Sequence, residues 1–372
     1  MAEPLKTSYG PPVVRQVAAA IAAVHPAFDG EAFTADTLAG YEALELMPRA
    51  RQIATHLARH LPADFAVTGE ILLASFGPPL GATTANGMAP FFYLPHGMVV
   101  AERGLGHFEL SMRVLHALTQ RFTAEFAIRP FLEHHTEATL ARLAEWSTDP
   151  SEHVRRLVSE GTRPRLPWAP RLRAFQRDPA PGLALLERLK DDPSLYVRRS
   201  VANHLNDIGK DHPALLNDTA RRWLVDATPE RRWIVGHALR SAVKRGDAGA
   251  LAVLGYGSAA RVALREPSVT PTRVVIGGQV RVQVVVHNPG RRRQRLLLDL
   301  QVDYVKARGQ SGPKVFKLTT LALGPGESAQ VGKTLSLADL STRRHHPGRH
   351  AVWLLVNGQA LPLGDFELLA AR

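Results

Sequence analysis

Two stretches of the chain share one pattern, DPSEHVRRLV at residues 149–158 and DPSLYVRRSV at residues 192–201. Both have the form D-P-S-x-x-V-R-R-x-V, and they begin 43 residues apart. A weaker third copy, TPERRWIVGHAL, begins at Thr228. A period of about 40–47 residues with paired helices is typical of HEAT-type repeats. The pattern therefore predicts an α-solenoid in which each repeat buries its apolar face against its neighbours.

Each copy is predicted to begin a helix. Asp149 and its counterpart Asp192 are placed to cap that helix, and the proline after each is tolerated in a first turn. Val154 and Val197 are expected to point inward, with the paired arginines near the exposed edge. An array of such repeats offers a curved, concave surface.

The period of the apolar residues changes along the chain. Up to about residue 245 they recur three and four apart, as in RARQIATHLARHL at 49–61, which indicates helices. From about residue 268 they alternate, as in VRVQVVVH at 280–287 and LDLQVDYV at 298–305, and the Asn-Gly of VNGQ at 356–359 is a strong hairpin signal. About seven short strands fit an immunoglobulin-like β-sandwich.

Three parts of the chain follow from this change of period. We predict an α-solenoid of HEAT-like repeats over 1–245, a linker over 246–267 and a basic immunoglobulin-like β-sandwich over 268–372.

The chain of 372 residues has a net charge of +12 and an isoelectric point near 10.4. This charge indicates a polyanionic partner, nucleic acid before an anionic membrane, although an ordinary basic protein from a high-GC genome has a similar composition. Residues 268–372 hold 15 Lys and Arg against 6 Asp and Glu. Basic turns at 291–295 and 341–350 hold much of this charge, so we expect them to contact phosphates rather than to be merely solvated loops.

Several classes of site are excluded or disfavoured. The absence of cysteine excludes disulfides and thiolate sites. The N-terminus resembles no signal peptide, and no run approaches the ~20 apolar residues of a membrane span. A cytoplasmic protein without a membrane partner is therefore expected. His56 and His60 are four residues apart, but no acidic residue stands at zincin spacing, so a surface or packing role is favoured and no metal is expected.

The candidate chemistry is carried by carboxylates and one tryptophan. Glu160 and Trp168 lie in LVSEGTRPRLPW, just past the first copy of the repeat; Glu125 lies in an apolar segment predicted to be helical, and Asp207 lies near the end of the second copy. For a single acid, an exposed or capping role is the usual alternative. For Trp168 the alternative is packing between repeats.

The segments 91–112, 145–172 and 191–213 together resemble the HEAT-like-repeat DNA alkylation-repair glycosylases, in the AlkC branch of the AlkC/AlkD superfamily. The similarity covers nearly the whole chain, and the basic β-rich end resembles the immunoglobulin-like domain that some AlkC members carry. The run S-E-G-T-R-P-R-x-P-W is the most specific part of the resemblance.

The resemblance implies a monofunctional glycosylase that removes cationic N3-alkylated bases, 3-methyladenine and 3-methylcytosine, without a deep base pocket and without a cofactor. It assigns the lesion site to Glu160, Trp168, Glu125 and Asp207. The partner implied is double-stranded DNA with alkylated bases, bound by a monomer that is associated with the nucleoid when on DNA. The predicted phosphate contacts are Arg155, Arg156, Arg163, Arg165, Arg198, Arg199, Arg291, Arg292, Arg293, Arg343 and Arg344.

A non-catalytic module remains the alternative. HEAT arrays often serve as protein scaffolds, and a basic sandwich can simply hold nucleic acid. A repeat protein that retains DNA binding but has lost activity is a second alternative.

Overall fold

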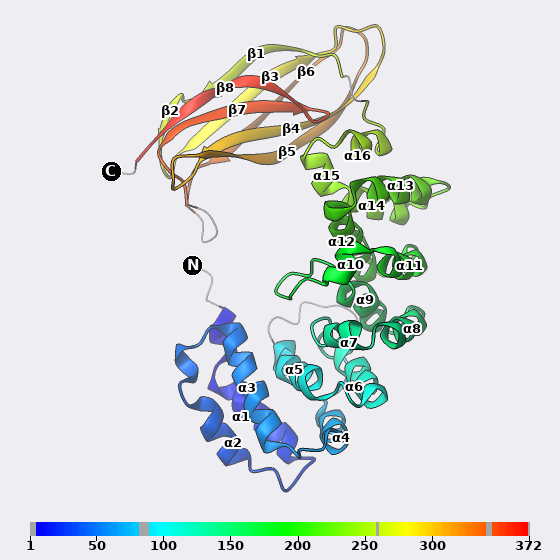
Figure 1. The fold of residues 1–372 in the computed structure, drawn as a ribbon. Helices are drawn as coiled ribbons and strands as arrows, with labels where there is room; N and C mark the ends of the chain where they lie inside the picture. Colours follow the sequence, from blue (N-terminus) through cyan, green and yellow to red (C-terminus); the bar gives the residue numbers. More distant parts are fainter. Residues whose placement is uncertain (1–4, 82–88, 258–259, 340–343, 371–372) are drawn as a thin grey trace. The chain divides into compact units, whose positions relative to one another are not determined.

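Helices form the chain up to Val253, and strands follow from Ala263, in a computed structural model that describes residues 5–81, 89–257, 260–339 and 344–370 (Figure 1). The chain divides into two compact units. The first comprises the residues up to Asp211 together with Ala227–Ala238, and the second comprises His212–Asp226 together with the residues from Leu239 onward. The predicted change from a helical to a strand period is confirmed.

The first unit is helical. No helix in the described part of the chain is both long enough and apolar enough to cross a membrane. Its elements are η1 (Leu5–Tyr9), α1 (Pro11–Ala22), α2 (Gly30–Leu38), η2 (Tyr41–Ala43), α3 (Leu46–His60), α4 (Phe65–Ser75), η3 (Ala89–Tyr93), α5 (Leu94–Arg103), α6 (Phe108–Thr119), α7 (Arg129–His134), α8 (Thr136–Trp146), α9 (Glu152–Gly161), α10 (Arg173–Arg177), α11 (Ala180–Leu189), α12 (Leu195–Asp211) and α14 (Pro229–Ala238).

The two copies of the repeat form α9 and α12, which pack against each other, and Val154 and Val197 are fully buried as predicted. The aspartates do not cap these helices. Asp149 Oδ1 instead accepts the backbone N–H of Ser151 at 2.8 Å, and Asp192 does the same for Ser194. The helices begin one residue beyond these serines, so aspartate and proline form a turn that precedes the helix.

The third copy is also helical. It forms α14, and the hydroxyl of Thr228 accepts the backbone N–H of Arg231 at 3.2 Å, as a capping residue does. The guanidinium of Arg231 donates to both oxygens of Asp191, at 2.7 and 2.6 Å. This ion pair joins the third copy to the turn before the second.

The described residues of the second unit form two sheets and three helices. One sheet has the strand order β1-β3-β6 and the other has the order β2-β8-β7-β4-β5. The elements are α13 (Pro213–Leu224), α15 (Arg240–Lys244), α16 (Ala248–Val253), β1 (Ala263–Thr270), β2 (Arg273–Val275), β3 (Gln279–His287), β4 (Gln294–Val305), β5 (Ser311–Leu323), β6 (Ser328–Ser336), β7 (Gly348–Val356) and β8 (Gln359–Leu369).

The two sheets share one apolar core. Along β3 every second residue is buried, and along β4 Leu298, Leu300 and Val302 are buried as the alternation predicts. Asp299 is buried as well, on the other face of its strand, which the alternation does not predict. β7 and β8 form the predicted hairpin, with the positive φ of Asn357 and Gly358 at its turn.

The predicted linker over 246–267 contains regular structure. It includes α16 and the start of β1. Its first residue, Gly246, has φ +75° and lies against the β7–β8 turn, where a Cβ on Gly358 would stand 2.6 Å from the Gly246 Cα. Only glycine permits this close approach of the two backbones. The start of the segment therefore packs against the hairpin and is not a free linker.

Candidate active site

Glu160 lies at the C-terminal end of α9 and is 6% exposed. A carboxylate is disfavoured at this end of a helix, so it needs compensating donors. Arg163 donates to Oε1 at 2.6 Å, Ser200 donates to Oε2 at 2.6 Å, and a guanidinium nitrogen of Arg156 lies 3.5 Å from Oε1. Both carboxylate oxygens are thereby fixed.

Two arginines extend this contact into a chain of alternating charges. Arg156 also pairs with Glu125, at 2.7 Å from Oε2, and Arg163 also pairs with Asp207, at 2.8 and 2.7 Å from Oδ2. Lys210 donates to the other oxygen of Asp207 at 2.8 Å. Three carboxylates from three parts of the chain are thus held together by cationic side chains. They come from the α6–α7 connection, α9 and α12, which lie in succession in the cyan and green part of Figure 1.

This environment decides the ionisation of Glu160. Burial alone would raise the pKa of Glu160, but Arg156, Arg163 and the hydroxyl of Ser200 hold it below its usual value. Glu160 is therefore ionised at neutral pH. The nearby His204 is fully buried, and burial lowers its pKa to about 4, so it is neutral at that pH.

Glu125 was predicted to lie in a helix, and this prediction is wrong. It lies in a turn between α6 and α7 and is 9% exposed. The side chain of Thr123 accepts the backbone N–H of Glu125 at 3.3 Å and donates to its carboxylate at 2.9 Å, which competes with helical hydrogen bonding. The next helix, α7, begins at Arg129, with Pro130 in its first turn. The turn lets the carboxylate reach Arg156.

Trp168 stands on the loop that follows α9. Its side chain is 64% exposed, and its φ of +65° is rarely adopted by a residue with a bulky side chain. Among the described residues no hydrogen bond or ring contact involves it. Packing between repeats is therefore not its role, and a strained, exposed aromatic on the loop that follows Glu160 is a candidate for function.

Arg129 holds the loop that carries Trp168 in place. It is 4% exposed, and its guanidinium donates to the backbone carbonyls of Gly161, Arg163 and Pro170 at 3.2, 2.9 and 2.5 Å. Burial lowers its pKa to about 10, so it keeps its charge at neutral pH. The loop that carries Trp168 is consequently fixed at both ends.

Several arginines predicted to contact phosphates have partners within the protein. Arg155 makes two hydrogen bonds to Asp192, at 2.6 and 3.1 Å, and Arg165 makes two to Asp211, at 2.9 and 2.5 Å. Arg198 donates to two backbone carbonyls. Together with Arg156 and Arg163, they hold the repeats and the loop in place, which favours a positioning role over a direct phosphate contact.

The other predicted arginines that the structure describes face solvent. Arg199 is exposed on α12 and has no ion pair among the described residues. Arg291, Arg292 and Arg293 are exposed in the connection between β3 and β4, and Arg344 is exposed before β7. Arg343 lies outside the described residues. These exposed side chains keep the capacity to bind phosphate.

Ser200 and Lys210 of the network, and Arg129, which holds the loop, were not predicted. Ser200 occupies the repeat position that Leu157 occupies in the first copy, so a polar residue at an otherwise apolar position was the available signal. Both positions are buried. Arg129 carried no such signal, because it lies outside the repeat and its partners are backbone carbonyls.

Two comparisons with known proteins cover nearly the whole chain, and a family model covers its C-terminal part. The family model that matches residues 263–370 is described as the C-terminal Ig-like domain of the uncharacterised protein YhaZ. The protein YhaZ of Bacillus subtilis (strain 168) is 37% identical over 366 residues, 98% of this chain and 99% of that protein. The structure of the Pseudomonas fluorescens alkylpurine DNA glycosylase AlkC, bound to DNA containing an abasic site analogue, matches with a TM-score of 0.91 at 39% identity, over 99% of this chain and 100% of that one.

The chain belongs to the AlkC family. The resemblance drawn from the segments around both copies of the repeat is thus confirmed, and so is an AlkC fold of helical repeats followed by an Ig-like domain. In this AlkC fold the carboxylate network lies on the repeats, and the exposed arginine run at 291–293 lies on the Ig-like domain.

Proposed function

We propose that this protein is a monofunctional DNA glycosylase that excises cationic N3-alkylated bases, 3-methyladenine and 3-methylcytosine, from double-stranded DNA. The observation that carries the proposal is the ionised, nearly enclosed Glu160 at the end of α9, followed by a loop that holds Trp168 exposed, in a chain of the AlkC family. We propose that it acts as a monomer on DNA in the cytoplasm and needs no cofactor for excision.

The chemistry requires little acid catalysis. A 3-methylated base is already a cation, so the electrons of the C1′–N bond neutralise it as it leaves. Positive charge then develops on the sugar, as an oxocarbenium-like species. Water adds at C1′ and loses its proton, which leaves an abasic site and a free, neutral methylated base.

In this proposal Glu160 stabilises the developing charge on the sugar. A carboxylate held ionised by arginines is a weak base, but it keeps its full negative charge, which favours electrostatic stabilisation over proton abstraction. Its low exposure strengthens that effect because little solvent screens it. Glu125 pairs with Arg156 and Asp207 pairs with Arg163, the two arginines that contact Glu160. In this proposal either carboxylate can orient the attacking water.

Trp168 supplies the second contact. An aromatic face binds a cationic base or sugar through cation–π attraction, worth ~0.5–2 kcal/mol. The open position of Trp168 suits a lesion that stays at the DNA surface rather than entering a deep pocket, which departs from the usual base-flipping route.

DNA contact is proposed for the exposed arginines. Each phosphate contact contributes roughly 0.9 to the slope of log affinity against log salt. Replacing Arg291, Arg292 and Arg293 by glutamine should reduce that slope by up to ~2.7, measured by fluorescence anisotropy on duplex DNA. An unchanged slope would remove this turn from the DNA interface.

Release of free methylated base tests the proposal. The protein is incubated with duplex DNA treated with a methylating agent, and the released bases are separated and identified by mass spectrometry. We expect 3-methyladenine and 3-methylcytosine in excess over a no-protein control. DNA binding without any base release would favour the non-catalytic module. Release of other alkylated bases alone would keep a glycosylase but reject the proposed substrates.

A further inference from the structure

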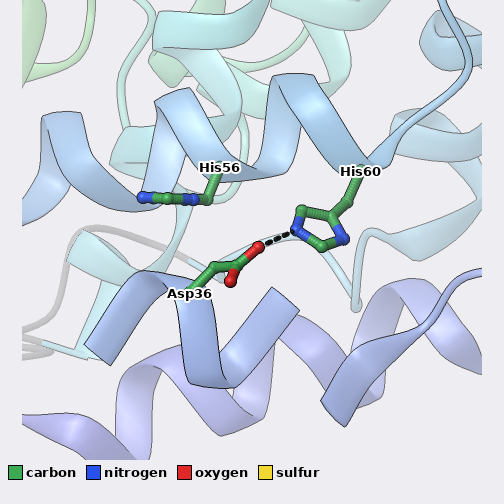
Figure 2. A group of neighbouring side chains, drawn as sticks. All are labelled: Asp36, His56 and His60. Atoms are coloured by element: carbon green, nitrogen blue, oxygen red, sulfur yellow. Dashed lines mark hydrogen bonds and ion pairs between the residues drawn. The ribbon is translucent and has the colours of Figure 1, made fainter. Parts of the chain in front are cut away.

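Three side chains with metal-binding chemistry meet in the N-terminal helices (Figure 2). His56 and His60 lie one turn apart on α3, and Asp36 faces them from α2. One potential ligand atom from each lies within 4.8 Å of the others. Sequence spacing alone did not pair an acid with these histidines, because Asp36 lies on a different helix.

The packing around His60 fixes one side of this cluster. Its Nε2 lies 2.8 Å from Asp36 Oδ2, and its ring packs edge-on against Phe33 with centroids 5.9 Å apart. Gln52 donates to the carbonyls of Thr37 and Ala39, which ties α3 to the end of α2. The helices that carry the three side chains are therefore held together independently of any ion.

His56 contributes the third potential ligand. No hydrogen bond holds either ring nitrogen among the described residues, and its Nδ1 is shielded from solvent without a partner. Buried nitrogen atoms without partners are uncommon and call for an explanation.

The donor set narrows the choice of ion. Two imidazoles and one carboxylate match the nitrogen and oxygen ligands of Zn²⁺, whereas Mg²⁺ and Ca²⁺ prefer oxygen ligands alone. The Asp36 side chain is 57% exposed, which leaves an open side for water to complete the coordination. Helical His-x₃-His spacing presents both rings on one face.

We propose that Asp36, His56 and His60 bind one first-row divalent metal ion, with Zn²⁺ preferred, and that the ion clips α2 to α3. The 2.8 Å contact between His60 and Asp36 would open slightly to admit the ion between them. None of the three residues hydrogen-bonds to the Glu160 network, so the site is structural and excision does not depend on it.

Binding of Zn²⁺ to the untagged full-length chain tests the proposal by calorimetry, with the visible spectrum of bound Co²⁺ reporting ligand geometry. The wild type should bind one tight equivalent of Zn²⁺ and melt several degrees higher with it than with a chelator. Asp36→Asn and His56→Gln should each weaken binding by more than about tenfold, since even loss of an outer partner costs about 10–100-fold. His134→Gln, at an exposed histidine, is the matched control and should change neither readout.

Melting in chelator separates a lost site from a lost fold. The two variants should melt there close to the wild type, and both are used so that one misfolded variant does not decide the result. Absence of saturable Zn²⁺ binding by the wild type would overturn the site. Equal binding by the wild type and both variants would overturn it too, since the ion would then be adventitious at another histidine.

Discussion

Each of the two clear copies of the repeat forms a helix, α9 or α12, but the copies differ in the contacts of their charged side chains. In both, the first arginine, Arg155 or Arg198, donates to the backbone carbonyls of the aspartate and proline that begin the copy. The second arginine differs. Arg156 lies half-buried between carboxylates and pairs with Glu160, whereas Arg199 is exposed and has no ion pair among the described residues. The first arginine thus has the same structural role in both copies, whereas the role of the second arginine differs between them.

Other differences between the copies fall at the same place. The position of Glu160 is Asn203 in the second copy, and the position of Leu157 is Ser200, which donates to Glu160. Most positions that the copies share build the helix and its turn. Glu160 and Ser200, at positions where the copies differ, join Arg156 in the charged network between α9 and α12. In a repeat protein, a departure from the repeat is therefore a signal of function in its own right.

The strongest test of this comparison replaces the second arginine in each copy. Arg156→Gln leaves two buried carboxylates without their shared cation, which typically costs about 3–5 kcal/mol of the free energy of unfolding. Arg199→Gln should change it by less than ~0.5 kcal/mol and should instead lower the salt slope of DNA binding by roughly 0.9. Denaturant unfolding and anisotropy measure the two effects. Equal destabilisation by both substitutions would contradict the comparison.

Glu160→Gln keeps the shape of the side chain and removes its charge. We expect base release to fall by about 10²–10³-fold, the scale of losing one preorganised electrostatic group. Binding to abasic-site DNA should change little. Single-turnover release from methylated DNA measures the rate. Glu187→Gln is the control, because Glu187 also pairs with a cation three residues along its helix, Lys190; a similar loss in this variant would mean that charge in general, not Glu160, matters.

Ser200→Ala removes the hydroxyl from Glu160 Oε2 and should cost about 1–3 kcal/mol of the free energy of unfolding at neutral pH. The folded pKa of Glu160 is lowered, so its stabilising contribution is present above the pKa of an unfolded glutamate, about 4.3, and is lost as pH falls through the folded value. The substitution raises that folded pKa. The destabilisation should therefore shrink toward acid pH, and the acidic limb of base release should move to higher pH.

Unfolding at several pH values and a pH–rate profile check this prediction. Ser147→Ala is the control, since Ser147 is also buried but its hydroxyl donates to a backbone carbonyl. An acidic limb that stays in place in Ser200→Ala would show that the hydroxyl does not tune Glu160.

Local patterns in the sequence predicted those features of the fold that depend on residues close together in the chain. The 43-residue repeat, the alternation along β3 and the Asn-Gly turn each depend on neighbours in the chain, and each was confirmed. The partners of the arginines were not predictable in this way. Arg163 and Asp207 are 44 residues apart, and their pairing depends on how two repeats stack. The turn at Glu125 was not predicted, because an apolar segment of this kind favours a helix. The hydroxyl of Thr123 accepts the backbone N–H of Glu125, and this contact competes with helical hydrogen bonding.

Trp168 gives the smallest expected effect and the sharpest one, because activity and stability should move in different directions. Trp168→Gly removes the aromatic face, which should slow base release by about 2- to 30-fold, the range of a cation–π contact. The same change removes a bulky side chain from a left-handed backbone, where strain costs of order 1–3 kcal/mol. The melting temperature should therefore hold or rise while activity falls. Trp233→Ala is the control, because Trp233 is also exposed but stacks on His237 in α14; it should leave base release unchanged. A fall in both stability and activity for Trp168→Gly would return Trp168 to a packing role.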